Sequence, residues 1–173
     1  MKKSLRIVIT GFMGSGKTTI ANALASRLDC HMVDLDSFIA EREGRTAVRI
    51  IAEDGEAAFR ENETNALRDL LSGTEARVIA LGGGTWTIAA NRDLIAQHEY
   101  VTVWLAAPFD LCWNRITASG HTVRPLAPGR DAARKLFERR RASYELAALK
   151  VEIDAHMDVA EVAARIQKEL ESP

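Results

Sequence analysis

A glycine-rich stretch near the start of the sequence has the pattern of a phosphate-binding loop. Residues 11–19 read GFMGSGKTT and match G-x-x-x-x-G-K-[ST] in full, with Gly11, Gly16, Lys17 and Thr18 at the fixed positions. Glycines let backbone N–H groups turn inward around an anion, and a helix beginning near Lys17 would point its positive end at the same spot. The stretch therefore predicts a nucleoside triphosphate site, which switch proteins, motors and small-molecule kinases all share.

Two aspartates, Asp34 and Asp36, stand two residues apart within the stretch 31–38, which reads HMVDLDSF. In an extended chain, side chains two apart point to the same side, and the carboxyl ends of parallel strands face the ligand crevice. One carboxylate could help position Mg²⁺, directly or through water, and the other could orient a substrate hydroxyl or take its proton. Such a pair would repel a phosphate acceptor, so it favours a polyhydroxy acceptor. The same residues also allow Asp36 to be a helix N-cap and Asp34 to be a surface charge.

A planar cation follows in the stretch 55–63, which reads GEAAFRENE. Arg60 and Glu63 lie three apart, on one face of an expected helix, so the carboxylate could hold the guanidinium in place. A guanidinium held in this way suits the bidentate recognition of a substrate carboxylate. The alternative is an ordinary surface ion pair.

Further arginines lie in the second half of the chain. Arg124 is part of residues 119–130, a stretch with two glycines and two prolines that reads as a loop, where an arginine could close over phosphates as part of a lid. A solvated loop charge is the alternative. The consecutive residues Arg139, Arg140 and Arg141 cannot all face one way on a helix, so at most one or two of them point inward.

Three glycines follow an apolar run in the stretch LGGGT, residues 81–85. Backbone N–H groups at such glycines can approach a ligand closely, although a simple tight turn would have the same composition. The three tryptophans, Trp86, Trp104 and Trp113, are scattered, and we interpret them as core or rim packing.

The hydrophobic pattern predicts the elements that would carry these residues. Strands are expected at residues 5–10, 31–35, 77–81, 99–106 and 149–154. Helices are expected at residues 17–28, 35–43, 46–53, 55–71, 88–97, 109–118, 131–147 and 158–171. Strands that alternate with helices favour a parallel sheet with helices on both faces.

Size and composition restrict the classes of protein. The chain has 173 residues, of which 47% are hydrophobic and 27% charged, with a net charge of −1. One domain spanning residues 1–173 is therefore expected, in the cytoplasm, and the charge balance favours neither a nucleic-acid nor a membrane partner. No apolar run has the length of a membrane span, and the start of the chain reads as a strand and not a signal peptide. Cys30 and Cys112 lack metal-like spacing and are expected to be buried thiols.

Taken together, these motifs resemble those of the shikimate kinases. GFMGSGKTT, VDLD, GEAAFRENE, LGGG, TVRPL and RRASYELA occur in the order and spacing of that family, over about residues 5 to 170. The resemblance implies a three-layer α/β P-loop NTPase fold with a five-stranded parallel sheet of order 2-3-1-4-5 and a mobile lid at about 119–130. It also implies a kinase that uses ATP to phosphorylate the 3-hydroxyl of shikimate, on the route to chorismate and the aromatic amino acids. Nothing in the sequence requires more than one copy of the chain, so a monomer is expected.

The resemblance also assigns the nucleotide and metal site. It implies that ATP is held by Gly14, Ser15, Gly16, Lys17, Thr18 and Thr19, by Arg115 against the adenine and by Arg124 of the lid. Thr18 and Asp34 would serve Mg²⁺. Lys17 and Arg124 are thereby also expected to take part in catalysis.

For the acceptor, the resemblance implies that helices within about residues 35–71 bind shikimate. Asp36 would bind the shikimate hydroxyls and is expected to be catalytic, either as the base or by orienting the hydroxyl. Arg60 and Arg140 would clamp the carboxylate. The glycines Gly82, Gly83 and Gly84 would line the site, with a backbone N–H of Gly83 offered to the substrate.

The sequence departs from the family at a few positions. Thr85 and Trp86 follow the glycine triplet where small residues are usual, Ala142 and Ser143 replace a usual proline, and the loop after Asp154 lacks the usual arginine and proline. The altered residues after the triplet support one alternative, a kinase of the same fold acting on a gluconate-type hydroxy acid. A second alternative is a nucleotide-binding regulatory protein with no acceptor.

Overall fold

A parallel sheet with the expected strand order forms the centre of the molecule. The structure is a computed structural model and describes residues 5–73, 76–120 and 127–172. Within them the strands are β1 (Ile7–Thr10), β2 (His31–Asp34), β3 (Ala76–Ala80), β4 (Val101–Ala106) and β5 (Leu149–Glu152). They form one five-stranded sheet in the order β2-β3-β1-β4-β5, with every pair parallel. The predicted order 2-3-1-4-5 is confirmed.

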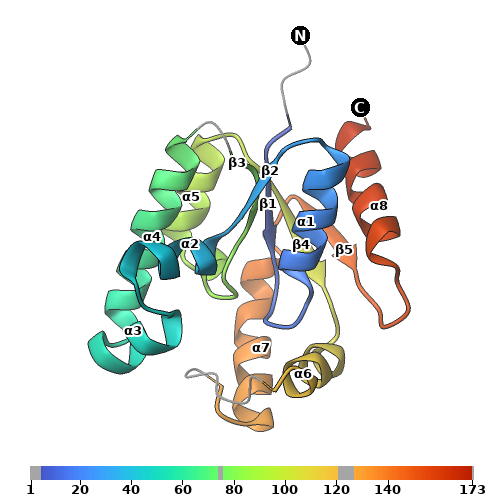
Figure 1. Cartoon of the computed structure of the whole chain (residues 1–173). Helices are drawn as coiled ribbons and strands as arrows, with labels where there is room; N and C mark the ends of the chain where they lie inside the picture. Colours follow the sequence, from blue (N-terminus) through green and yellow to red (C-terminus); the bar gives the residue numbers. More distant parts are fainter. Residues whose placement is uncertain (1–4, 74–75, 121–126, 173) are drawn as a thin grey trace.

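Helices cover both faces of this sheet and complete a three-layer fold (Figure 1). The α-helices are α1 (Lys17–Arg27), α2 (Leu35–Glu43), α3 (Ala47–Asp54), α4 (Glu56–Ser72), α5 (Ala89–Gln97), α6 (Phe109–Ala118), α7 (Arg130–Tyr144) and α8 (Val159–Glu171). Helix α1 packs against α8 on one side, and α4 packs against α5 on the other.

The expected α-helices agree with these bounds to within a residue or two, except at the end of α7, and one further short helix was not expected. Helix α7 ends at Tyr144 and not at residue 147, because the N–H groups of Leu146 and Ala147 bond to carbonyls three residues back in tight turns before β5. A short 3₁₀-helix, η1 (Thr85–Thr87), was not predicted. It forms directly after the glycine triplet, where the N–H of Thr85 bonds to the carbonyl of Gly82.

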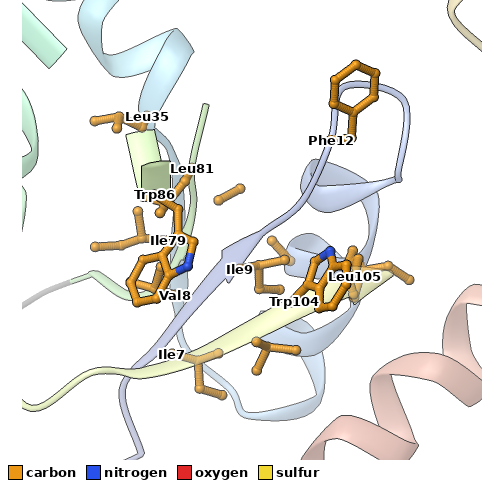
Figure 2. Close-up of a cluster of buried hydrophobic side chains, with 14 of the residues drawn as sticks. Ile7, Val8, Ile9, Phe12, Leu35, Ile79, Leu81, Trp86, Trp104 and Leu105 are labelled. Atoms are coloured by element: carbon orange, nitrogen blue, oxygen red, sulfur yellow. The ribbon is translucent and has the colours of Figure 1, made fainter. Parts of the chain in front are cut away.

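The central strand β1 is buried on both faces, as its continuous apolar run predicted. Ile7, Val8 and Ile9 have no exposed surface. Figure 2 shows Ile7 and Ile9 on one side of the strand and Val8 on the other, as the alternation of a strand requires. Trp86 lies near Val8 and Trp104 near Ile9 in the same view. Both tryptophans are nearly buried, which confirms the interpretation of these side chains as packing residues.

Two further expectations meet the structure with mixed results. Cys112 is buried, but Cys30 keeps intermediate exposure, so the prediction of two buried thiols is wrong for Cys30. Cys30 stands in the turn between α1 and β2, where one side of the chain faces solvent. Among the described helices, none combines the length and hydropathy that a bilayer span requires.

The parallel sheet brings distant motifs to one edge. The phosphate loop follows β1, Asp34 ends β2 and the glycine triplet follows β3. Because β3 lies between β1 and β2 and all three run in the same direction, their carboxyl ends meet at this edge.

Candidate active site

The loop between β1 and α1 has the backbone of an anion cradle. Gly14 and Gly16 adopt φ values of +79° and +96°, a region that L side chains rarely enter. A Cβ on Gly14 would also lie 2.6 Å from the carbonyl oxygen of Cys112, so this position cannot carry a side chain without displacing backbone. Gly16 is the N-cap of α1, which has no side-chain cap and no acidic residue in its first turn. The N–H groups at this helix end are therefore open to an anionic ligand.

An orphaned hydroxyl supports the same conclusion. Ser15 is 1% exposed, and its Oγ has no hydrogen-bond partner within the described residues. A buried hydroxyl without a partner costs free energy, and a phosphate oxygen would satisfy it. Lys17 folds back over the loop, where its Nζ donates to the carbonyl of Phe12 at 3.0 Å. The loop therefore combines a buried hydroxyl, the N–H groups of a helix end and an ammonium group, all of which suit a phosphate.

A hydroxyl and a carboxylate meet beside this loop. Thr18 Oγ1 donates to Asp34 Oδ2 at 2.5 Å, and Asp34 Oδ1 accepts from the backbone N–H of Ser37 at 3.1 Å. Both are hard oxygen ligands of the kind that Mg²⁺ prefers, with waters and phosphate oxygens completing its shell. The described residues contain no cluster of three or more His, Cys, Asp or Glu side chains able to hold a metal. A magnesium that is bound mainly through nucleotide phosphates needs only one or two protein oxygen ligands, and Thr18 and Asp34 are suited to supply them.

The structure corrects two expectations about the aspartates. The N-cap of α2 is Asp34, whose carboxylate accepts from Ser37, and Asp36 lies inside the first turn of the helix. The chain is thus no longer extended at Asp36, so the argument from strand alternation was wrong. Asp36 reaches the same edge for another reason: β2 ends directly in a helix whose first turn faces the phosphate loop, and both aspartates line one cavity with Lys17.

The Arg60–Glu63 pair is not a surface pair, which excludes that alternative. Arg60 Nη1 donates to Glu63 Oε2 at 2.7 Å, and the Glu63 side chain is only 1% exposed. On the same helix, Arg60 Nη2 also donates to Glu56 Oε1 at 3.4 Å. A guanidinium has five N–H groups, and these two contacts use two of them, so others remain for a further carboxylate.

A second guanidinium faces the same space from α7. Arg140 is 8% exposed, whereas Arg139 and Arg141 are exposed, as the argument from helix geometry predicted. Burial lowers the pKa of Arg140, and the nearby positive charge of Arg60 lowers it further. An arginine remains protonated in proteins even so. Two cations forced together in this way favour an anion between them.

The glycine triplet lets these side chains come close to the backbone. A Cβ on Gly82 would lie 2.8 Å from Asp36 Oδ1, and one on Gly83 would lie 3.2 Å from Arg140 Nη1. On Gly84 it would lie 2.5 Å from both terminal nitrogens of Arg60. The triplet is therefore more than a tight turn, because its glycines leave room for four charged side chains: Asp36 and Glu63 at Gly82, Arg140 at Gly83 and Arg60 at Gly84.

Three adjoining cavities follow this arrangement. The Arg60 cavity, of about 110 Å³, is lined by the triplet, by Arg60 and Arg140, and by residues of α2, α3 and α4. The P-loop cavity, of about 260 Å³, is lined by the phosphate loop and both aspartates. These two cavities share Met13, Asp36 and Gly83. Asp36 therefore stands at the junction between the phosphate cradle and the pair of arginines.

The third space, the Arg115 cavity of about 230 Å³, continues from the other end of the phosphate loop. It shares Gly16 and Thr19 with the P-loop cavity and is lined on one side by Ile153, Met157 and other apolar residues. Arg115 Nη1 donates to the carbonyls of Gly14 and Ser15, at 3.3 and 3.4 Å, which fixes the guanidinium against the loop. A cation facing an apolar wall suits a planar aromatic group such as a nucleobase.

Nearly all the residues expected at the site are thus brought together. The exception is Arg124, because residues 121–126 of the expected lid lie outside the described residues. Sequence reasoning assigned no role at the site to two buried side chains, Thr85 and Tyr144. Tyr144 donates its hydroxyl to the carbonyl of Gly83 at 2.5 Å, and burial raises its pKa to about 12. The signals for Thr85 were its place directly after the triplet and its size, because small residues are usual there in the family that the motifs resemble.

Comparisons with known proteins agree with this geometry. A family model described as shikimate kinase matches residues 13–171. A shikimate kinase from Enterococcus faecalis is 41% identical over 141 residues, covering 80% of this chain and 82% of that protein. A bifunctional shikimate kinase/3-dehydroquinate synthase from Thermotoga maritima is 36% identical over 140 residues, covering 81% of this chain but only 27% of that protein. The structure of a shikimate kinase from Acinetobacter baumannii in complex with shikimate aligns with a TM-score of 0.89 at 31% identity, covering 98% of this chain and 94% of that one.

Proposed function

The chain belongs to the shikimate kinase family, and we propose that it transfers the γ-phosphoryl group of ATP to the 3-hydroxyl of shikimate in its three adjoining cavities. The observation that carries the proposal is the position of Asp36. This carboxylate lines both the Arg60 cavity and the P-loop cavity, so it can touch an acceptor hydroxyl beside a bound triphosphate.

The Arg60 cavity would hold the acceptor by its carboxylate. Arg60 and Arg140 present guanidinium groups to the cavity, and such groups bind a carboxylate in bidentate fashion. The ring hydroxyls would then face Asp36 and the backbone N–H of Gly83. The solved shikimate kinase from Acinetobacter baumannii contains shikimate, which supports this choice of acceptor.

The other two cavities would hold ATP. The N–H groups at the start of α1, the Ser15 hydroxyl and Lys17 would bind the phosphates, and the base would lie between Arg115 and the apolar wall. Thr18 and Asp34 would hold Mg²⁺. When bound, Mg²⁺ supplies charge neutralisation at the phosphate oxygens.

Catalysis would depend mainly on positioning and charge. Asp36 would accept a hydrogen bond from the attacking hydroxyl, orient it and receive its proton. Lys17 would offset negative charge on the transferring group. From the resemblance, we assign Arg124 of the proposed lid to the same task. All these groups belong to one chain, so a monomer suffices, and consumption of ATP fits the cytoplasm.

The test is a coupled assay of ADP release with pure protein, MgATP and four acceptors: shikimate, quinate, gluconate and AMP. We expect turnover with shikimate and little with the others. Turnover with gluconate alone would favour the gluconate-type alternative. ATP binding by calorimetry without binding of any small acid would favour the regulatory alternative, and either result would overturn the proposal.

A further inference from the structure

The short helix η1 contains a buried hydroxyl that the reaction as described does not use. Thr85 has no exposed surface, and its Oγ1 donates to Glu63 Oε1 at 2.5 Å. Glu63 comes from α4, 22 residues earlier in the chain, so the contact joins η1 to the helix that carries Arg60.

Glu63 relays this contact to Arg60. Its two carboxylate oxygens have different partners: Oε1 accepts from Thr85 and Oε2 accepts from Arg60 Nη1. A carboxylate that is 1% exposed depends on such partners for its orientation, because water does not replace them. If the hydroxyl is removed, Oε1 loses its donor and the plane of the carboxylate is free to turn.

Helix η1 is itself held firmly in place from α5. Asn91 Nδ2 donates to the carbonyl of Thr85 at 3.0 Å, and Arg92 Nη1 donates to the carbonyl of Trp86 at 2.8 Å. The Thr85 hydroxyl therefore projects from a fixed backbone. If Glu63 shifted, Thr85 would not move with it.

The same turn is also tied to α7, which carries Arg140. Trp86 Nε1 donates to the carbonyl of Ser143 at 2.8 Å, and Ser143 lies one helical turn after Arg140. Helix η1 therefore contacts both helices that supply the arginines. Thr85 is connected to the guanidinium of Arg60 through Glu63. Trp86 is connected to the backbone of α7 at Ser143, one turn after Arg140.

We propose that Thr85 is a positioning residue whose hydroxyl orients Glu63, so that Glu63 holds Arg60 at the place relative to Arg140 that a substrate carboxylate requires. This inference rests on the proposed function, because it concerns the binding of the same acceptor. Thr85 does not line the Arg60 cavity, so its effect passes through Glu63 and Arg60 and not through contact with the substrate.

The experiment compares Thr85→Val with Thr85→Ser. Valine keeps the shape of threonine and lacks the hydroxyl, whereas serine keeps the hydroxyl. We expect Thr85→Val to raise KM for shikimate about tenfold, the scale of one hydrogen bond to a charged group, with KM for ATP unchanged. Thr85→Ser keeps the hydroxyl, so its KM for shikimate should stay within about twofold of the KM of the unmodified protein. A purely structural role would change both KM values together.

A double-mutant cycle tests the route through Arg60. In an Arg60→Ala background, Thr85→Val should raise KM for shikimate no further, because the group that it positions is gone. An undiminished effect in that background would overturn the proposal, as would equal KM values for Thr85→Val and Thr85→Ser. If Thr85→Val does not fold, as judged by thermal unfolding, Thr85→Ala replaces it in both comparisons.

Failure of this inference is distinguishable from failure of the proposed function. If the unmodified protein neither binds shikimate in calorimetry nor releases ADP with it, the proposed function fails. If it does both while Thr85→Val behaves like Thr85→Ser, only the role of Thr85 fails.

Discussion

Asp36 is the side chain on which the proposed chemistry depends most directly. The sequence singled it out by its spacing from Asp34, and it does reach the expected edge of the sheet. The reason for that position could not be predicted locally, because it depends on where β2 stops and α2 begins. A shift of that boundary by two residues would make Asp36 the N-cap in place of Asp34.

Asp36→Asn should separate catalysis from binding. The amide keeps the size of the carboxylate but cannot accept the proton, so kcat should fall about 10²- to 10⁴-fold while KM for shikimate changes little. Steady-state kinetics measures both values. Asp93→Asn makes the same change of charge at an exposed position of α5 and should leave kcat unchanged. A kcat for Asp36→Asn within threefold of the unmodified protein would contradict the role of Asp36.

Burial decides the role of Arg60 and could not be seen in the sequence. An arginine and a glutamate three apart on a helix most often form an exposed pair that contributes little. Here the glutamate is buried beneath η1, a contact between segments distant in the chain. Sequence spacing therefore identified the pair but not the environment that makes it useful.

At the scale of elements, the end of β3 is where backbone and side chains come closest. Gly84→Ala would place a Cβ 2.5 Å from Arg60 Nη1 and Nη2. These two nitrogens form the far end of a flexible side chain. The guanidinium should move and the fold should survive, so KM for shikimate should rise about tenfold with little loss of stability. Gly73→Ala, where the nearest atom would be 3.4 Å away, is the matched control. Equal KM values for the two variants would show that Arg60 is not held against the triplet.

Helix α7 fixes the other side of the triplet through Tyr144, and this contact has a pH signature. Burial raises the pKa of Tyr144 to about 12. The folded state therefore favours the neutral phenol. This preference contributes to the free energy of unfolding below pH 10, and the contribution is lost as the pH rises from 10 towards 12. Between pH 9 and pH 11 the unfolding free energy should fall about 1 kcal/mol more for the unmodified protein than for Tyr144→Phe.

Denaturant titrations at the two pH values would measure this difference. Tyr144→Phe also loses the hydrogen bond to Gly83, but that loss lowers stability by a similar amount at both pH values. The change with pH therefore isolates the titration of the phenol. Parallel stability curves for the two proteins would mean that the hydroxyl is not buried in the way described.

The regular elements were predictable and the irregular ones were not. Hydrophobic periodicity located the strands and α-helices to within a few residues, because each has a repeating pattern of burial. Helix η1 and the early end of α7 follow from hydrogen bonds in turns that have no period. Both places adjoin the site, because η1 follows the glycine triplet and α7 ends at Tyr144, whose hydroxyl donates to Gly83.

At the scale of the whole molecule, alternating strands and helices predicted a parallel sheet, but only the family resemblance supplied the strand order. That order places β3 between β1 and β2, so the triplet lies beside the phosphate loop and Asp36. The lid at 119–130 stays a prediction, because Arg124 lies outside the described residues. The three adjoining cavities are a property of the assembled sheet edge, to which every strand end at the site contributes.

The most direct test of the account is a crystal structure of the protein with shikimate and a non-hydrolysable ATP analogue with Mg²⁺. It should place the shikimate carboxylate between Arg60 and Arg140 and its 3-hydroxyl within hydrogen-bond distance of Asp36. The hydroxyl oxygen should lie about 3–3.5 Å from the γ-phosphorus, in line for transfer. Shikimate bound outside the Arg60 cavity, or a γ-phosphate separated from Asp36 by the width of another residue, would contradict the account.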